Sequence, residues 1–190
     1  MPPLASAATR LVTIARRRPA LPCGTRVVAV DGPSGSGKTT LAAHLEAHLR
    51  RTGGHVVVVH MDDLYPGWDG LAAAVTLLSS QVVEPLAQGR DGAYQRYDWA
   101  RGAYAERHEI LCATAWLVVE GVGCGADVIR PRLAALAWLE ADRETRRRRG
   151  LERDGESYAP HWERWAGQES AHFAGHATRE HADLVVDTGQ

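Results

Sequence analysis

Residues 26–51 read RVVAVDGPSGSGKTTLAAHLEAHLRR, and this stretch decides the fold. The β-branched run at 26–31 predicts a short buried strand. Residues 39–51 repeat apolar side chains at helical spacing, and glycines 53–54 follow as a stop signal. Between the strand and the helix, residues 32–39 match the pattern GxxxxGK[ST] at every fixed position. The stretch therefore predicts a strand, a glycine-rich loop and a helix in immediate succession.

This loop has the composition of a phosphate-binding loop. Glycines allow backbone conformations that other residues resist, so successive N–H groups can point inward and form an anion nest. The following helix adds its positive end. The pattern predicts that Lys38, the only lysine of the chain, binds the β- and γ-phosphates of ATP and that Thr39 binds Mg²⁺. The predicted nucleotide-binding residues are Gly32, Pro33, Ser34, Gly35, Ser36, Gly37, Lys38, Thr39 and Thr40.

The composition is that of an ordinary globular protein. The chain has 190 residues, a formal net charge of −1 and 45% apolar residues, which suits one compact domain. There is no broad basic excess to indicate a nucleic-acid partner, and no apolar run reaches the ~18 residues that span a bilayer. The three cysteines form no CxxC pair and suit free thiols in a reducing cytosol. We therefore expect a cytoplasmic protein without a nucleic-acid or membrane partner, and leave its oligomeric state open.

The N-terminal segment is predicted to be helical. Residues 1–18 carry an apolar stripe at helical spacing and end in three arginines before Pro19. A transit peptide is also rich in arginine and free of acidic residues. The charges cluster at one end, however, where they suit the negative end of the helix dipole. We expect residues 1–23 to form a helix packed on the domain, and residues 24–190 to form the P-loop domain itself.

Four more strands are predicted beyond the first. Residues 55–61, 115–120 and 182–187 form apolar runs, and 136–140 form a weaker one, with helical patterns between them. Strands that are apolar throughout indicate a parallel sheet that is covered on both faces. The sequence thus predicts an α/β protein: a three-layer P-loop NTPase fold with a five-stranded parallel sheet flanked by helices and a short arginine-rich lid. Residues 89–104, polar, aromatic and glycine-bearing, are expected to form a functional loop.

Acidic residues stand at the predicted carboxyl ends of the strands, where ligands bind in such sheets. Asp62 and Asp63 end the second strand and Glu120 ends the third. A carboxylate here can orient or deprotonate an acceptor hydroxyl, and can bind the Mg²⁺ shell, so Thr39, Asp62 and Glu120 are the metal candidates. Turn caps and solvated strand ends are the ordinary alternatives. Asp31, before the loop, is expected to hold the loop backbone.

Two further helices carry groups of interest. The segment 142–153 is rich in arginine, and a solvated charged face is the ordinary explanation for such a run. Arg149 and Arg153 are four residues apart and so share one side of the helix. Six like charges repel unless an anion compensates them, and we expect two or three arginines of the set to reach phosphate. The six arginines are Arg143, Arg146, Arg147, Arg148, Arg149 and Arg153. In the helix predicted over 158–179, the shared face of Trp162, Trp165 and Glu169 suits packing against the sheet. A helix over 70–88 is expected to be interrupted near Pro85.

The chain resembles a known group of kinases in four short segments. Residues 28–40 look like the opening of small nucleoside and nucleotide kinases. Residues 61–65 (Met-Asp-Asp-Leu-Tyr), 97–99 (Tyr-Asp-Trp) and 118–121 (Val-Val-Glu-Gly) are similar to segments of the uridine kinase and phosphoribulokinase group, with Leu and Trp in place of its usual phenylalanines. The resemblance implies a small-molecule kinase, which transfers the γ-phosphoryl group of MgATP to a hydroxyl of a small metabolite.

The resemblance also implies roles for individual residues. Asp62 would be the base, and Lys38, Arg149 and Arg153 would stabilise the transferring group. The acceptor would contact Asp63, Tyr65, Tyr97, Asp98, Trp99, Arg101 and Glu120.

The acceptor itself is left open by the sequence. A nucleoside is the first candidate, with pantothenate or sugar phosphates close behind. One alternative is a nucleoside monophosphate kinase like cytidylate kinase, which needs an arginine-rich pocket that Arg90, Arg96, Arg101 and Arg107 could supply. Another alternative is a nucleotide-binding protein without catalysis.

Overall fold

The computed structural model describes residues 3–155 and 158–189, so residues 1–2 of the predicted N-terminal helix and residue 190 lie outside the described part. The strands there are β1 (Arg26–Asp31), β2 (Val56–His60), β3 (Gly92–Asp98), β4 (Ala103–Ile110), β5 (Trp116–Glu120), β6 (Leu133–Glu140) and β7 (Leu184–Asp187). The α-helices are α1 (Pro3–Arg17), α2 (Lys38–Arg51), α3 (Leu71–Leu77), α4 (Glu84–Ala87), α5 (Arg143–Asp154) and α6 (Trp162–His176). Shorter helical segments are η1 (Met61–Asp63), η2 (Leu78–Val83), η3 (Arg130–Arg132) and η5 (Ala159–His161).

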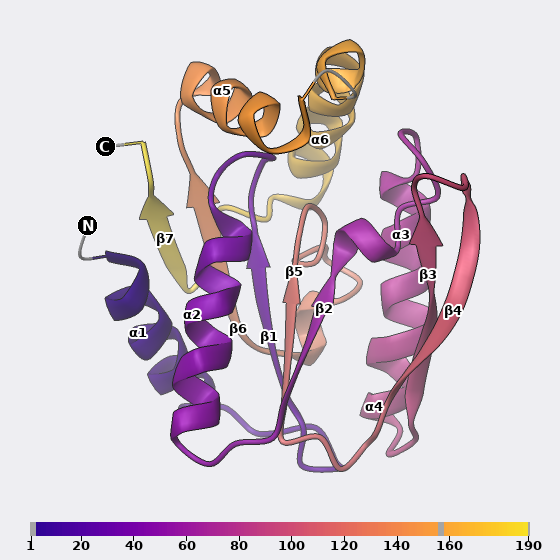
Figure 1. The fold of residues 1–190 in the computed structure, drawn as a ribbon. Coiled ribbons are helices and arrows are strands. Elements are labelled where there is room, and N and C mark those ends of the chain that lie inside the picture. Colours follow the sequence, from indigo (N-terminus) through magenta and orange to yellow (C-terminus); the bar gives the residue numbers. More distant parts are fainter. Residues whose placement is uncertain (1–2, 156–157, 190) are drawn as a thin grey trace.

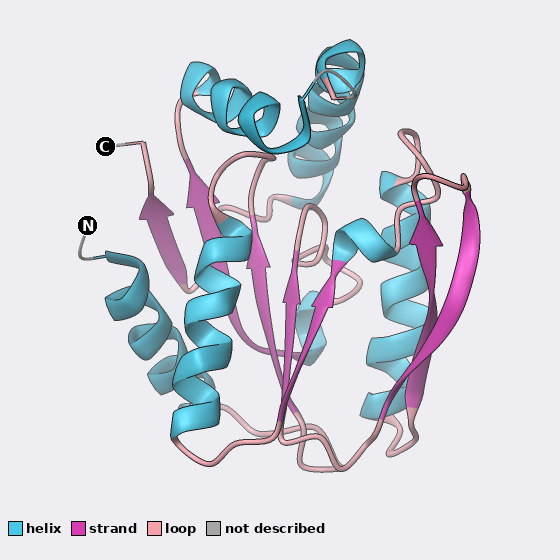
Figure 2. Cartoon of the chain, viewed as in Figure 1, coloured by secondary structure: helices cyan, strands magenta, loops and turns pink. Residues whose placement is uncertain are grey.

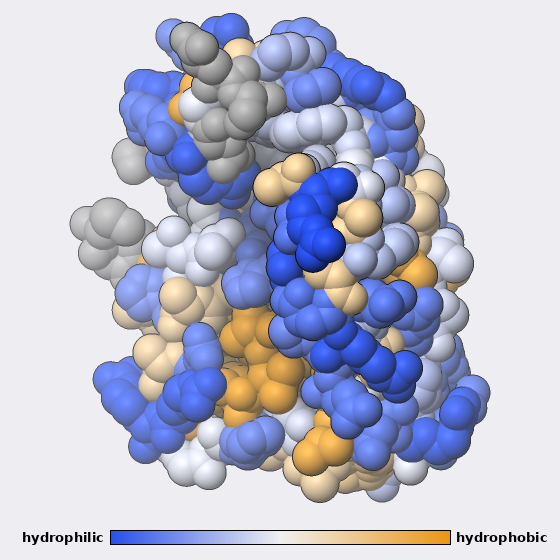
Figure 3. Space-filling model, turned by 45° about the vertical axis from the view of Figure 1, so that its right-hand side comes forward, coloured by the Kyte–Doolittle hydropathy of each residue, from blue (hydrophilic) through white to orange (hydrophobic). Residues whose placement is uncertain are grey.

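Five strands form one parallel sheet in the order β2-β5-β1-β6-β7 (Figures 1 and 2). This confirms the predicted five-stranded parallel sheet, although β6 begins at Leu133, three residues before the predicted start. Parallel strands need crossover connections. Helix α2 connects β1 to β2, α5 and α6 lie between β6 and β7, and residues 121–132, with the short η3, connect β5 to β6. The edge strand β2 has half-buried valines at 57 and 58. Separately, Figure 3 shows a patch of apolar surface in a hollow among hydrophilic residues.

The three layers follow from the alternation of side chains along the buried strands. In β1, Val27 and Ala29 belong to one hydrophobic cluster, and Val28 and Val30 belong to another. The first cluster lies against α3, η2, α4 and α6, and the second against α1 and α2. Successive side chains of a strand point to opposite faces, so a strand that is apolar at every position requires cover on both sides.

The segment expected to be a functional loop at 89–104 is largely a β-hairpin, and that expectation is wrong. β3 and β4 pair antiparallel from Gly92 opposite Ile110 to Asp98 opposite Ala103, apart from the five-stranded sheet (Figure 1). Most side chains of the hairpin are polar or only half-buried, because only one of its faces rests on the rest of the protein. The weak apolar alternation that results explains why the pattern indicated a loop.

The predicted interruption near Pro85 is a π-helical turn. η2 joins α3 to α4 and ends directly before α4, where Pro85 is at the first turn. A proline has no N–H and its ring crowds the carbonyl four residues earlier, so regular helix cannot continue through it. The wider π turn provides room for this ring.

Helix α1 packs on the sheet through one apolar face. Leu4, Ala8, Leu11 and Ala15 are buried in the cluster that also contains α2 and β6. The basic last turn ends in Arg16 and Arg17, as the predicted dipole argument requires. Within the described residues, no helix combines the length and the apolar character that a bilayer crossing needs.

Leu11→Ala should lower the free energy of unfolding by about 2–5 kcal/mol, because its fully buried side chain leaves a cavity between α1 and the sheet. Urea unfolding measures this change. The exposed neighbour Arg10 provides the control, since Arg10→Ala should change the free energy of unfolding by less than about 0.5 kcal/mol. Equal values for the two variants would mean that α1 is not part of the cooperative core.

Candidate active site

The register of the sheet brings three polar groups to one edge. Glu120 at the end of β5 lies opposite His60 of β2 and opposite Val30 of β1, so that Asp31 follows beside it. The glycine-rich loop begins directly after Asp31, and α2 begins at Lys38. Parallel strands end at the same edge, and this edge is therefore where the polar side chains of the site gather.

The glycines of the loop are required by its conformation. Gly32, Gly35 and Gly37 have φ values of 138°, 77° and 90°, in the region that side chains rarely adopt. A Cβ atom on Gly32 would overlap the carbonyl oxygen of Leu139, and one on Gly35 would overlap that of Arg146. The loop is therefore pressed against β6 and α5, and only glycine fits at these two positions.

Asp31 fixes the entrance of the loop. Its carboxylate accepts hydrogen bonds from the backbone N–H groups of Gly32 (2.7 Å), Gly123 (3.0 Å) and Gly125 (2.8 Å), and it is fully buried. Burial raises the pKa of Asp31 to about 6, against the lowering effect of these hydrogen bonds and of Lys38. Asp31 thus joins the end of β1 to the loop after β5, the structural role that the sequence indicates.

Lys38 lies at the bottom of the loop. Its side chain is only 8% exposed, and Nζ donates a hydrogen bond to the carbonyl oxygen of Pro33 at 3.1 Å. An ammonium group has three donors, so this bond leaves two for phosphate oxygens. The loop is thereby tied back to the helix that follows it.

Glu120 is the centre of a small polar network. One of its oxygens, Oε1, accepts from the Thr39 hydroxyl (3.1 Å) and lies 2.6 Å from Nδ1 of His60. Burial alone would raise the pKa of Glu120, but His60, Lys38 and Thr39 outweigh it and hold that pKa below its ordinary value. The hydrogen bond to Glu120 correspondingly raises the pKa of His60.

The donor set here suits Mg²⁺. Magnesium prefers oxygen ligands and usually keeps several waters while it binds one or two carboxylates and substrate phosphates. The Thr39 hydroxyl and the carboxylates of Glu120 and Asp62 are oxygen donors around one cavity. Among the described residues no group of three or more His, Cys, Asp and Glu side chains is placed to hold a metal alone. A cation at this site would therefore depend on phosphate and water ligands.

Two cavities meet above the loop. One cavity, of about 530 Å³, is called the phosphate cavity here after the phosphate-loop pattern in its lining. It is lined by Ser34, Gly35, Gly37, Lys38, Thr39, Thr40, His60, Asp62, Asp63, Glu120, Gly121, Val122, Arg149, Gly150 and Arg153. The aromatic cavity, of about 390 Å³, is lined by Ser34, Asp62, Tyr65, Trp68, Trp99, Arg153, Tyr158 and Trp165. Ser34, Asp62 and Arg153 belong to both linings, so a carboxylate and a guanidinium stand where the two cavities join.

The walls of the aromatic cavity are held by ring contacts. Trp68 stacks on Tyr158 and His161, with ring centroids 5.5 Å and 4.4 Å away, and Trp99 contacts it edge-on at 5.0 Å. The Trp99 indole N–H also donates to the backbone carbonyl of Asp62 at 2.8 Å. The hairpin that carries Trp99 is thereby fastened to the end of β2.

Asp62 and Asp63 differ in their surroundings. Asp62 lines both cavities, whereas Asp63 lines only the phosphate cavity. Asp63 also interacts electrostatically with Arg96 and His108 on the hairpin. Burial raises the pKa of Asp63 above its ordinary value. Of the two, Asp62 is the one that a ligand in either cavity would meet.

The arginines of α5 have separate environments. Arg143 forms an ion pair with Glu163 at 2.7 Å, and the exposed Arg148 lies 3.9 Å from Glu152. Arg149 donates to the carbonyl oxygen of Gly35 (3.4 Å) and to that of Thr188 (2.7 Å). Arg153 lines both cavities. The predicted pair Arg149 and Arg153 thus shares the phosphate cavity, at different places.

Three predicted acceptor residues lie elsewhere in the hairpin. Tyr97 contacts the rings of Trp99 and Tyr104. The Asp98 carboxylate accepts from the backbone N–H groups of residues 100 and 101 and caps the hairpin turn. Arg101 is exposed. In the described part of the chain these three side chains are outside the linings of both cavities.

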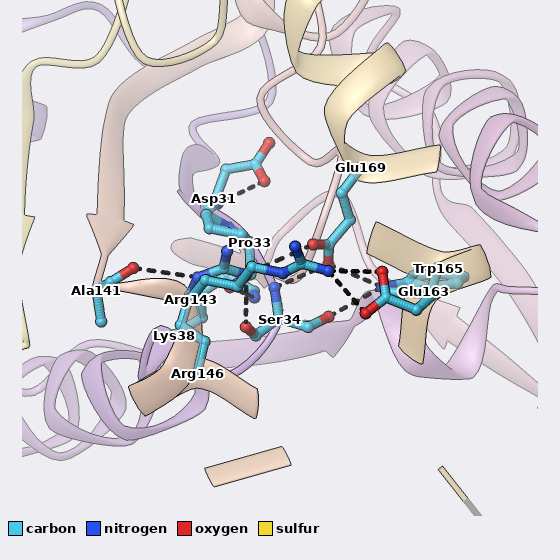
Figure 4. Close-up of polar contacts among 11 residues, drawn as sticks. Asp31, Pro33, Ser34, Lys38, Ala141, Arg143, Arg146, Glu163, Trp165 and Glu169 are labelled. Carbon is cyan, nitrogen blue, oxygen red and sulfur yellow. Dashed lines mark hydrogen bonds and ion pairs between the residues drawn. The ribbon is translucent and has the colours of Figure 1, made fainter. Parts of the chain in front are cut away.

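The sequence does not identify several groups at the site. Trp165 and Glu169, expected only to pack, contact Ser34 of the loop, as does Arg146 (Figure 4). His60 is also missed, although the parallel pairing of its strand with that of Glu120 could have indicated it. The contacts of residue 34 with residues near 165 carry no signal in the sequence, because they depend on the tertiary fold.

The buried carboxyl group of Asp31 predicts a pH dependence of stability. Its pKa is about 6 in the folded protein and 3.8 in the unfolded chain, so its contribution is complete below pH 3.8 and is lost as pH rises through 6. The free energy of unfolding of the wild type, relative to Asp31→Asn, should therefore fall between pH 4 and pH 6. Urea unfolding at several pH values measures it. Parallel curves would contradict the raised pKa, and a carbon NMR titration of Asp31 checks it independently.

Comparisons with known proteins agree with this fold. No protein-family model matches the chain, and no curated protein matches it in sequence. Among solved structures, it is similar to a possible uridine kinase from Bacillus stearothermophilus, with a TM-score of 0.68, 22% identity, and coverage of 96% of this chain and 100% of the other. A provisionally assigned fructose transport system kinase from a Silicibacter species has a TM-score of 0.61 and 22% identity, over 96% and 98% of the two chains. D-glycerate 3-kinase from Cryptococcus neoformans has a TM-score of 0.57 and 13% identity, over 82% and 79%. The resemblance to the uridine kinase group is thus confirmed at the level of the fold.

Proposed function

We propose that the protein is an ATP-dependent kinase that phosphorylates a hydroxyl group of a small molecule. The observation that carries this proposal is the junction of the two cavities. The phosphate cavity contains the glycine-rich loop, and the aromatic cavity opens beside it, with Asp62 and Arg153 in both linings. A hydroxyl group presented from the aromatic cavity would meet the terminal phosphate next to a carboxylate, which is the arrangement that phosphoryl transfer needs.

The residues of the junction have distinct proposed roles. MgATP would supply the phosphoryl group, and its magnesium ion would neutralise phosphate charge when bound. Thr39 and Glu120 would hold the metal, and Lys38 would bind phosphate oxygens. Asp62 would orient the acceptor hydroxyl and take its proton. Arg153 would stabilise the charge that spreads over the equatorial oxygens during transfer.

The aromatic cavity favours an acceptor with a flat ring. Five of its lining residues are Trp or Tyr, whose faces suit stacking. Arg153, the one cation among the described lining residues, is shared with the phosphate cavity. A nucleoside has both a flat ring and hydroxyl groups. The cavity therefore supports a nucleoside as the first candidate among the acceptors.

A nucleoside monophosphate is less well supported. Its own phosphate would need free arginines near the acceptor, but Arg96 is paired with Glu106, and Arg107 is exposed and lies 3.8 Å from Glu109. Arg90 and Arg101 are exposed, outside the lining of the aromatic cavity. A protein that binds nucleotide without catalysis stays the second alternative. An acceptor screen distinguishes it from both kinds of kinase.

The screen measures ADP formation from ATP and Mg²⁺ with nucleosides, nucleoside monophosphates, sugars, sugar phosphates and pantothenate. We expect acceptor-dependent turnover with a nucleoside. Lys38→Ala should abolish it and weaken ATP binding, because a buried cationic contact to phosphate is lost, whereas Arg148→Ala on the exposed side of α5 should not. ATP binding without turnover on any acceptor would favour the non-catalytic alternative. Turnover only with nucleoside monophosphates would favour a nucleoside monophosphate kinase.

Asp62→Asn should lower kcat by about 10²–10⁴-fold with little change in ATP affinity, because a base and orienting group is worth that much. Asp63→Asn is the matched control on the next residue, and we expect a smaller effect on kcat because Asp63 is outside the lining of the aromatic cavity. Steady-state kinetics and calorimetric titration with ATP measure both quantities. A larger loss of kcat in Asp63→Asn would assign the role to Asp63, and equal losses would contradict a separate role for Asp62.

A further inference from the structure

We propose that Glu169 is a positioning residue for the phosphate loop, and that Trp165 joins it to the wall of the aromatic cavity. Both residues come from α6, more than 120 positions along the chain from the loop. The inference rests on the proposed function only where it takes the loop to be a phosphate site and the aromatic cavity to be the acceptor site.

Glu169 holds the loop by its backbone. The carboxylate is 3% exposed, and Oε1 accepts from the N–H of Ser34 at 2.8 Å and from the indole N–H of Trp165 at 2.8 Å. Its other oxygen lies 3.8 Å from the guanidinium of Arg146, which also donates to the carbonyl oxygen of Ser34 at 3.3 Å. Both ends of the Ser34 residue are therefore fixed, and Figure 4 shows Ser34 between Arg146 and the α6 pair.

The next peptide groups of the loop are held by their carbonyl oxygens. The carbonyl groups of residues 34–36 accept hydrogen bonds from side chains outside the loop, and the donors are Arg146 (3.3 Å), Arg149 (3.4 Å) and Thr188 (2.9 Å). In a trans peptide the carbonyl and the following N–H point in opposite directions. Side chains that draw the carbonyls outward therefore turn the following N–H groups toward the cavity, where an anion would bind.

The loop needs this support because its glycines are permissive. Positive φ angles at Gly32 and Gly35 flank Ser34, and glycine has the largest conformational freedom to lose when a loop becomes ordered. A loop already held in its binding conformation does not lose that freedom when the phosphates bind. Glu169 accepts from the N–H of Ser34 and thereby fixes the peptide group that directly precedes this series.

A stabilising role alone explains Glu169 poorly. A buried charge is costly to desolvate, and buried ion pairs are often no more stabilising than apolar residues of similar volume. Here the described partners of the carboxylate are the N–H of Ser34 and two side chains, Trp165 and Arg146, that themselves donate hydrogen bonds to Ser34. The buried carboxylate thus belongs to a network that converges on one residue of the loop.

Trp165 extends the arrangement to the aromatic cavity. Its indole N–H contacts both the Ser34 hydroxyl (2.9 Å) and Glu169, while its ring lines the cavity and meets Tyr65 edge-on at 4.8 Å. The loop and the cavity wall are therefore joined by hydrogen bonds through one side chain. A displacement of that wall would therefore alter the hydrogen bonds that hold Ser34.

The test uses ADP as the probe, measured by calorimetric titration of the full chain. Glu169→Ala should weaken ADP binding by about tenfold or more, since it removes a charge-assisted hydrogen bond to the loop. Glu169→Gln keeps an oxygen acceptor for both N–H groups and should restore binding to within about threefold of the wild type. Glu163→Gln is the control on the same helix, because Glu163 is exposed and pairs only with Arg143 among the described contacts, and it should not change ADP affinity.

Several results would overturn the proposal. Wild-type affinity in Glu169→Ala, or equal losses in the Ala and Gln variants, would show that the hydrogen bond does not position the loop. A lowered melting temperature with unchanged ADP affinity would mean a stabilising role only. If the wild type binds no ADP, the phosphate-loop assignment fails and this inference with it, whereas ADP binding without any acceptor turnover would count against the kinase proposal alone.

Amide hydrogen exchange of Ser34 tests the geometry first in the wild type, where no substitution can disturb folding. In the ligand-free wild type this amide should be protected, and exchange at the rate of an unstructured peptide would overturn the proposal. In Trp165→Phe, which keeps a ring in the wall but loses the indole N–H, exchange at Ser34 should be faster. Unchanged exchange in that variant would remove the link between the cavity wall and the loop.

Discussion

The site depends on the direction of the peptide groups between Gly32 and Gly37. Backbone N–H groups bind an anion only when they converge on it, and a chain in ordinary φ,ψ regions does not make them converge. Positive φ angles at three glycines permit the required turn, and hydrogen bonds to the carbonyls outside select it. The local sequence thus makes the loop conformation possible through its glycines, and contacts from the rest of the chain select that conformation.

The contacts that select the loop conformation come from the C-terminal part of the chain. Helix α5 contributes Arg146 and Arg149, α6 contributes Trp165 and Glu169, and Thr188 follows β7. On the other side, Asp31 joins β1 to the loop after β5. The conformation of the glycine-rich loop therefore depends on contacts from segments that follow β6 and β7 in the chain, and not on the local sequence alone.

Local patterns predict the parts of this structure that are local. The strand, loop and helix of residues 26–51 are encoded by β-branching, glycine spacing and helical periodicity, and each appears where these features place it. The hairpin was not predicted, because only one of its faces is covered and its apolar alternation is weak. The contacts of Glu169 and His60 depend on tertiary packing and on strand order. The sequence patterns correctly predict that Glu169 is on a helix and that His60 is near the end of a strand. They do not predict which groups these two side chains contact.

The buried position of Lys38 has a consequence for chemical labelling. It is the only lysine of the chain, it is 8% exposed, and its amine faces the phosphate cavity. No other side chain carries a primary amine, so an amine-selective reagent that modifies a side chain must enter this cavity to do so. The chain thus carries a built-in reporter: the rate of lysine modification follows the accessibility of one cavity, without the background that surface lysines give in most proteins.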